Sequence, residues 1–204
     1  LNFAIKRLAE IFGIMIFAVG VMLFLALITY SPEDPNFIFP DKTEIENLLG
    51  FQGSFVSDLF FQSVGLIAYL ISFSLIITGI NIFRIKEFFL VIENIFFTIL
   101  YSILGTLFLS HFYYKSFFLY INGNGGFVGN YLDQTFLGNL IQINENVSYF
   151  IIIIITLALF LVSINFSLKT FFSSLKKMLN FFFKKEEKNY TDKNEIIHEY
   201  IPQD

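Results

Sequence analysis

The chain has 204 residues, of which 55% are hydrophobic and 20% aromatic, and its formal net charge is −4 at pH 7. A soluble domain of this length has too small an interior to bury so much apolar surface, so the composition excludes a water-soluble globular protein and indicates a lipid environment. The sequence contains no cysteine, which excludes disulfides, thiolate metal sites and thiol chemistry.

The first apolar run covers residues 11–30 and follows the basic pair Lys6 and Arg7. It is long enough to span a bilayer as a helix, and no small-residue cleavage site closes it as in a signal peptide. We therefore expect a first membrane-spanning helix whose N-terminus is cytoplasmic. Two prolines, Pro32 and Pro35, end that helix. The acidic loop over residues 31–46 is interpreted as a solvated outer connector, with a binding surface as the alternative.

The second apolar run covers residues 59–83 and contains no charged residue. As one continuous helix it would reach about 37 Å, enough to cross a bilayer with some tilt. Asp58 precedes the run, and Arg84 and Lys86 follow it. Because basic residues favour the cytoplasmic side, we expect this helix to run from outside to inside.

The third apolar run, residues 88–109, follows after a very short connection, which predicts a helical hairpin on the inner side. Glu93 and Asn94 lie within it, and an ionisable side chain inside a membrane is costly. Pairing of Glu93 with Arg84 or Lys86 near the interface is the favoured explanation. A proton or ion relay is the alternative.

The segment between the third and fourth runs is glycine-rich over residues 122–129 but matches neither GxGxxG nor a Walker A loop. Apolar residues over 127–141 recur at helical spacing for about four turns, too short to cross a bilayer. We expect a short outer helix there that lies on the membrane interface or dips into it. The fourth span is expected over residues 147–168.

The C-terminal part changes composition after residue 168. Residues 169–185 combine apolar residues at helical spacing with lysines, which is typical of an amphipathic helix on the inner leaflet. Direct continuation of the fourth helix into the cytoplasm is the alternative. The lysines expected to contact the inner leaflet are Lys169, Lys176, Lys177, Lys184 and Lys185. Residues 186–204 are polar and mixed in charge, as at the start of a cytoplasmic linker.

The distribution of basic residues predicts the topology of the chain. Of the 13 lysines and arginines, eleven fall on the proposed inner side and only Lys42 and Lys115 fall outside. This asymmetry predicts four spans with both termini in the cytoplasm. The expected domains are residues 1–168 for the membrane bundle, 169–185 for the basic segment and 186–204 for the linker.

The residues indicate no catalytic, cofactor or metal site. His111 and His198 are expected on opposite sides of the membrane, and neither HExxH nor GxSxG occurs.

Three short motifs resemble those of a known family. Residues 29–35, Thr-Tyr-Ser-Pro-Glu-Asp-Pro, resemble the Thr-Tyr-x-Pro-x-Asp-Pro motif of the N-terminal membrane domain of FtsK/SpoIIIE-type DNA translocases. Residues 47–69 resemble that family's Asn-Gly-Gly-Ala-Asp…Gly…Ala-Tyr pattern, and residues 125–129 resemble its Gly-Gly-x-x-Gly. The resemblance covers roughly residues 5–168. The chain departs from the family at Ser72, where many members have proline, and in having no tryptophan. The motif positions are Tyr30, Pro32, Asp34, Pro35, Asn47, Gly50, Gly53, Asp58, Gly65, Ala68, Tyr69, Gly125, Gly126 and Gly129.

This resemblance implies an all-α integral membrane protein with four transmembrane helices and a short outer interfacial helix. It implies a membrane anchor and an interaction or oligomerisation domain of a bacterial septal DNA translocase, acting in cell division and chromosome segregation. The ATPase motor is absent from these residues, so no enzyme activity is expected of them, and DNA and ATP would be bound only through the motor. The family further implies a hexamer in the inner membrane that contacts the bilayer and other cell-division membrane proteins. The alternative function is a small stand-alone transporter or channel, which would show broken spans or polar groups near the bilayer midplane.

The glycines of these motifs lead to a packing prediction. We expect the Tyr30–Pro35 segment to pack against Gly50 and Gly53, with residues 125–129 against both. A bulky side chain should be tolerated less well at Gly53 or Gly126 than at Gly20.

Overall fold

The structure, a computed structural model, describes residues 2–35, 45–115, 119, 121–167, 173 and 176. It divides into two units, residues 1–166 and 167–204, and the account below concerns the first. The basic segment 169–185 and the linker 186–204 lie outside the described residues, except for residues 173 and 176. Lys169, Lys177, Lys184 and Lys185 are therefore not placed.

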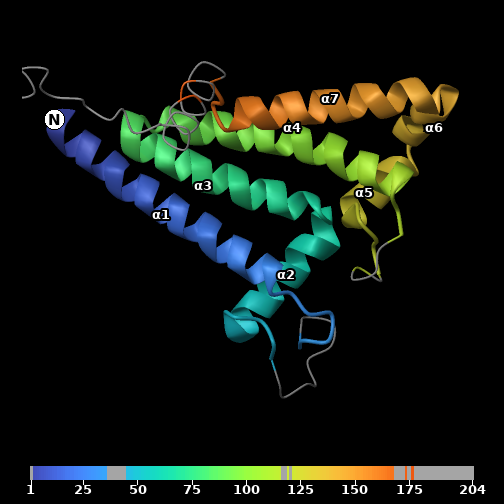
Figure 1. Cartoon of the computed structure of the whole chain (residues 1–204), viewed down its shortest axis with the longest axis horizontal. Helices are drawn as coiled ribbons and strands as arrows, with labels where there is room; N and C mark the ends of the chain where they lie inside the picture. The colour runs from blue at the N-terminus through green and yellow to red at the C-terminus, as the bar shows by residue number, and fades with distance from the viewer. Residues whose placement is uncertain are drawn as a thin grey trace, which may run out of the picture. The chain divides into compact units, whose positions relative to one another are not determined.

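The described part of the chain is helical throughout, without strands (Figure 1). Within these described residues, four helices are long and apolar enough to span a membrane. They are α1 (Asn2–Ile28), α3 (Ile67–Ile85), α4 (Phe89–Phe112) and α7 (Glu145–Ser163). The shorter helices are α2 (Gly50–Val64), α5 (Gly126–Asp133) and α6 (Phe136–Ile143). The predicted all-α, four-span fold is confirmed.

The four spans form two antiparallel pairs, in which α1 lies along α3 and α4 lies along α7 (Figure 1). Glycines allow α1 and α3 to approach closely. A Cβ atom on Gly79 would lie 2.5 Å from the backbone nitrogen of Phe17, and one on Gly13 would lie 2.7 Å from that of Phe83. Between α3 and α4, Ser74 Oγ lies 3.1 Å from the hydroxyl of Tyr101. Between α4 and α7, Asn94 Nδ2 donates to the Ser163 carbonyl at 3.1 Å.

The expectation of one continuous helix over residues 59–83 is wrong. The run is broken at Gly65, which has φ +59°, a conformation that favours glycine. The backbone N–H of Leu66 leaves the helical pattern and donates to the Asn124 carbonyl at 2.9 Å. The apolar residues before the break belong to α2, which runs at an angle to α3 (Figure 1). Phe61 of α2 is buried in a core with Leu27 of α1 and is not exposed to lipid.

Two other element boundaries differ from prediction. The expected single helix over residues 127–141 is two helices, α5 and α6, and the Thr135 hydroxyl caps α6 by accepting from Leu137 N at 3.3 Å. The fourth span ends at Ser163, earlier than the expected residue 168. The physical reason is a turn at Asn165, which has φ +50°, a left-handed conformation that asparagine tolerates and a continuing helix cannot contain.

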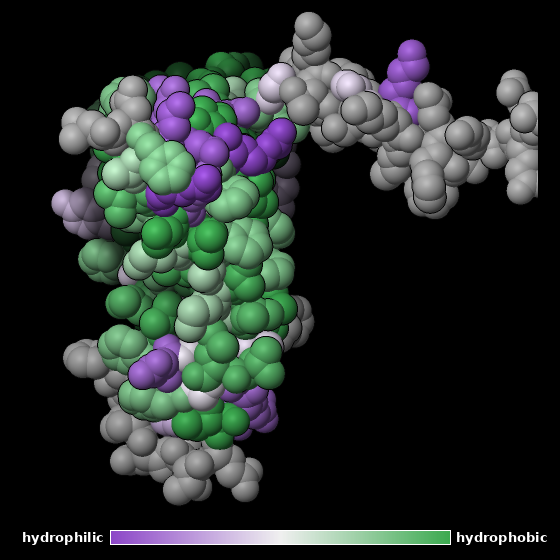
Figure 2. Space-filling view, turned by 90° about the vertical axis from the view of Figure 1, so that its left-hand side faces the viewer, coloured by the Kyte–Doolittle hydropathy of each residue, from purple (hydrophilic) through white to green (hydrophobic). Residues whose placement is uncertain are grey.

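The two ends of the four spans have different chemistry, and we name them accordingly. The charged end is where α1 and α4 begin and where α3 and α7 end; the motif end is the opposite one. At the charged end the Glu10 carboxylate lies 2.6 Å from Arg7 Nη1 and 2.6 Å from Lys86 Nζ. Figure 2 looks onto this end and shows hydrophilic surface gathered beside a broad hydrophobic surface.

The expected pairing of Glu93 is not made. Lys86 is paired with Glu10 of α1, and Glu93 forms no ion pair with Arg84 or Lys86. The reason is geometric, since the close α1–α3 contact brings Glu10 to the end of α3. Asn94, the neighbour of Glu93, is buried and connects α4 to α7.

Candidate functional site at the motif end of the helices

The segment after α1 is held to the segment before α2 by one buried carboxylate. The two oxygens of Asp34, a side chain only 2% exposed, accept from the backbone N–H groups of Glu46 at 2.8 Å and Asn47 at 3.0 Å. Asn47 is also buried, and its Nδ2 donates to the carbonyls of Ala26 at 2.8 Å and Thr29 at 3.2 Å. Those carbonyls have no partner within the last turn of the helix, so Asn47 caps the C-terminus of α1.

A second polar group connects Tyr30 to α2. The Tyr30 hydroxyl and Gln62 Nε2 each donate to Asp58 Oδ1 at 3.3 Å. Asn122 Nδ2 then donates to Gln62 Oε1 at 2.9 Å, which extends the group to the loop before α5. Burial raises the pKa of the Asp58 carboxyl, while the hydrogen bonds from Gln62 and Tyr30 act in the opposite direction.

The remaining motif residues of the first two segments also lie at this end. The Pro35 carbonyl accepts from Ser54 Oγ at 2.9 Å, so α2 is fixed directly to the Tyr30–Pro35 segment, in which Pro32 is half-buried. Ala68 is fully buried, and the Tyr69 hydroxyl donates to the Leu27 carbonyl at 3.2 Å. The predicted packing of the Tyr30–Pro35 segment against the start of α2 is present.

The third glycine segment lies elsewhere on α2 than predicted. The nearest atoms to a Cβ on Gly53 would belong to Asn47 and Leu49, whereas those nearest Gly126 belong to Gly65 and Ser63. Ser63 is ten residues beyond Gly53, about 15 Å along the helix. The expected contact of residues 125–129 with Gly50 and Gly53 is therefore wrong. The segment packs against the break between α2 and α3, a feature the prediction did not include.

The same segment also packs against α4. A Cβ on Gly125 would lie 2.1 Å from Ser110 Oγ, and one on Gly129 would lie 2.3 Å from the Thr106 carbonyl. Gly20, chosen as a tolerant position, is also tightly packed, because a Cβ there would lie 2.8 Å from Ile76 N on α3. The predicted contrast with Gly20 is thus not supported. Gly50 differs from these glycines, because a Cβ atom added there would have no described atom within 4 Å apart from those of its chain neighbours and its own helix.

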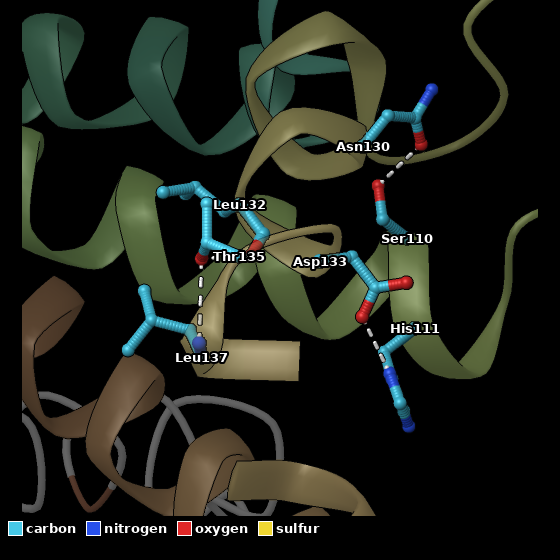
Figure 3. A network of polar contacts seen from close by, with 7 residues as sticks. All are labelled: Ser110, His111, Asn130, Leu132, Asp133, Thr135 and Leu137. Carbon is cyan, nitrogen blue, oxygen red and sulfur yellow. Dashed lines mark hydrogen bonds and ion pairs between the residues drawn. The ribbon is translucent and has the colours of Figure 1, made fainter. Parts of the chain in front are cut away.

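Sequence reasoning missed the polar contacts that fix α5 to α4 (Figure 3). Ser110 Oγ donates to Asn130 Oδ1 at 2.9 Å, and His111 Nδ1 lies 2.6 Å from Asp133 Oδ1. Asn130 and Asp133 are three residues apart on one helical face, opposite the apolar stripe. That spacing was the available signal for a polar face directed at the end of α4.

The chemistry of this site is structural. Among residues 2–35, 45–115 and 121–167 no three histidine or carboxylate side chains are grouped to hold a metal ion. The buried carboxylates of Asp34 and Asp58 accept hydrogen bonds from backbone and side chains that fix loop positions. These contacts hold α2, α5 and the neighbouring loops together at the motif end.

Comparison with known proteins places these features in a family. A family described as the "4TM region of DNA translocase FtsK/SpoIIIE" matches residues 5–176. The chain is 35% identical over 69 residues to a DNA translocase FtsK of Caulobacter vibrioides. That alignment covers 34% of this chain and 8% of the relative, so the chain spans only a small part of that protein's length. No solved structure matches.

Proposed function

The chain belongs to the FtsK/SpoIIIE four-transmembrane family, and from this membership we propose that it anchors a DNA translocase at the division septum of a bacterial cell. The anchor would lie in the inner membrane and serve cell division and chromosome segregation. The 204 residues contain no GxxxxGK[ST] phosphate-binding loop, so we assign DNA movement and ATP hydrolysis to a motor domain and not to these residues.

The observation that carries this proposal is the family match over residues 5–176, a range that includes α3, α4, α7, the motif end and all but the first residues of α1. At that end, polar side chains of the first two motifs hold the loops by hydrogen bonds, and the glycines of the third motif pack closely against α4 and the α2–α3 break. A surface held together in this way would suit contacts with other division membrane proteins.

The distribution of charge supports an orientation with the charged end in the cytoplasm. Lys6, Arg7, Arg84 and Lys86 lie at the charged end, whereas Lys115 lies at the motif end. Cytoplasmic ends of membrane proteins carry the excess of lysine and arginine. Both termini of the four-span region would then be cytoplasmic, which suits attachment to DNA-handling machinery.

Assembly into an oligomer, with a hexamer as the state implied by the family, is part of the proposal. Among the four spans α7 is the least buried, and it packs mainly on α4. Its exposed side includes Phe150, Ile154 and Leu157, which leaves an apolar surface for lipid or a neighbouring copy.

Imaging in dividing bacteria tests the proposed anchor. A fluorescent protein fused after residue 204 should gather in a band at midcell. A uniform signal around the whole envelope would contradict a septal anchor. Ion or solute flux through liposomes that contain the purified chain would instead favour a transporter.

A further inference from the structure

An apolar groove lies between α1 and α3, and the large apolar side chains that line it are exposed. Gly13 and Gly79 form its floor, and Ile14, Phe17, Ile80 and Phe83 line its walls. Its volume is about 230 Å³. The groove exists because the two glycines have no side chains to fill it and because the helix backbones touch there.

The groove leads toward a basic surface at the charged end. On α1, Glu10 and Lys6 lie three and seven residues before Gly13, on the same face of the helix. On α3, Arg84 lies one turn beyond the groove residue Ile80. Glu10 closes this end by bridging Arg7 and Lys86, each at 2.6 Å.

The charged end carries more positive charge than the single carboxylate of Glu10 can neutralise. Glu10 is a single carboxylate shared by two cations, and Lys6 and Arg84 are exposed and form no ion pair with another described residue. The other acidic groups nearby are Glu87, which is exposed, and Glu93, which is half-buried. The guanidinium of Arg7 is 58% exposed and has further N–H donors available.

We propose that the α1–α3 groove and its basic end form a binding site for one anionic phospholipid. One acyl chain lies in the groove between Ile14 and Ile80. The phosphate-bearing headgroup lies at the charged end, where Lys6 and Arg84 attract it and Arg7 donates hydrogen bonds to it. A guanidinium and ammonium groups favour such an anion over a zwitterionic headgroup.

The shape of the groove favours a lipid chain over a helix from a second copy. A groove of about 230 Å³ has room for a segment of acyl chain but not for a whole helix, so a second copy could insert only side chains there. The charge also favours lipid, because a second copy would bring the same basic surface to this end and the two would repel.

Native mass spectrometry of the full chain released from detergent tests this site. We expect dioleoylphosphatidylglycerol to be retained more than dioleoylphosphatidylcholine. The double variant Lys6→Gln/Arg84→Gln should weaken binding of the anionic lipid roughly 10- to 30-fold, since each cation near a headgroup contributes about fivefold. It leaves the Glu10 bridge intact, and Lys115→Gln at the motif end is the control that should change nothing.

A second pair of variants tests the groove itself. Ile80→Phe fills the groove and should lower lipid retention, whereas Ile154→Phe on the exposed side of α7 should not. Both variants should keep a cooperative thermal transition in detergent, which is the check that they are folded. Soluble glycerol phosphate, which has the headgroup chemistry without a chain, should compete poorly.

Several results would overturn the proposal. These are equal retention of the two lipids, unchanged retention after Lys6→Gln/Arg84→Gln or Ile80→Phe, and glycerol phosphate binding as tightly as the lipid. Efficient disulfide dimers of Ile80→Cys in native membranes would also overturn it, because a second copy would then occupy the groove.

Discussion

Several polar side chains at the motif end are buried in the folded chain. Asp34, Asn47 and Asp58 are each at most 4% exposed, yet each has hydrogen-bond partners. A buried polar group that loses its partner costs more than the hydrogen bond contributes. Single substitutions that leave a buried group without its partner should therefore lower the stability of the fold more than substitutions of lipid-facing residues do.

Replacement of Asn47 by alanine should destabilise the chain by about 2 kcal/mol, because the carbonyls of Ala26 and Thr29 lose their donor. Asn139→Ala is the matched control, since that side chain is exposed on α6. The measurement is the midpoint of thermal denaturation in detergent. Equal midpoints for the two variants would contradict the capping role of Asn47.

Asp58 predicts a pH dependence of stability. Because burial raises the pKa of Asp58 in the folded state, the folded chain holds this proton more tightly than the unfolded chain. The stabilisation is complete below the ordinary aspartate pKa and is lost as pH rises through the raised value. Asp58→Asn should remove this contribution to the pH dependence, so the melting temperature of the variant minus that of the wild type should become more positive from low pH to neutral pH. A difference that becomes more negative with rising pH would reverse the assigned direction.

At the scale of the elements, glycine geometry decides where helices break and how closely they pack. Gly65 separates α2 from α3, and the segment Asn124–Gly126 contacts that break. The two helices can then meet at an angle, and α2 remains at the motif end. A longer straight helix would remove the surface on which the motif residues gather.

Gly65→Ala should be far more harmful than Gly50→Ala. Both glycines have positive φ, +59° and +64°, so alanine brings backbone strain at either position, on the order of 1–2 kcal/mol. Only at Gly65 does the added Cβ collide with a backbone oxygen, that of Asn124, whereas at Gly50 the space is open. Folded yield after extraction, measured by size-exclusion chromatography, compares the two. Similar yields would show that the α2–α3 break is not fixed by this contact.

The four spans and their order could be predicted because length and hydropathy alone define them. Hydropathy could not show the break at Gly65, since residues 59–83 are apolar without interruption and a glycine also occurs within continuous membrane helices. The use of Gly13, Gly20 and Gly79 at the α1–α3 contact was missed for a related reason. Which glycines touch a neighbour depends on how α1 is rotated against α3, and nothing in the local sequence gives that rotation.

Many residues of the candidate site could be predicted from the sequence, but the hydrogen bonds that join them could not. Tyr30, Asp34 and Asn47 were singled out by resemblance, and their hydrogen bonds join segments that lie up to 28 residues apart. The contacts of Ser110 and His111 with α5 carry no motif. The spacing of Asn130 and Asp133 indicates a polar face on α5, but it does not show that this face packs against the end of α4.

At the scale of the whole molecule, the two ends of the spans have distinct roles in this account. The motif end presents a surface fixed by buried polar contacts, and the charged end carries basic residues and the proposed lipid site. The proposed function requires that the charged end face the cytoplasm. The orientation of the chain is therefore the central claim.

Cysteine labelling in intact cells tests that claim most directly, because the chain has no cysteine of its own. Lys115→Cys places a thiol at an exposed position of the motif end, and Glu87→Cys places one at an exposed position of the charged end. A membrane-impermeant maleimide should label the first variant in intact cells and the second only after the membrane is opened. Labelling of Glu87→Cys in intact cells, with Lys115→Cys protected, would contradict the orientation.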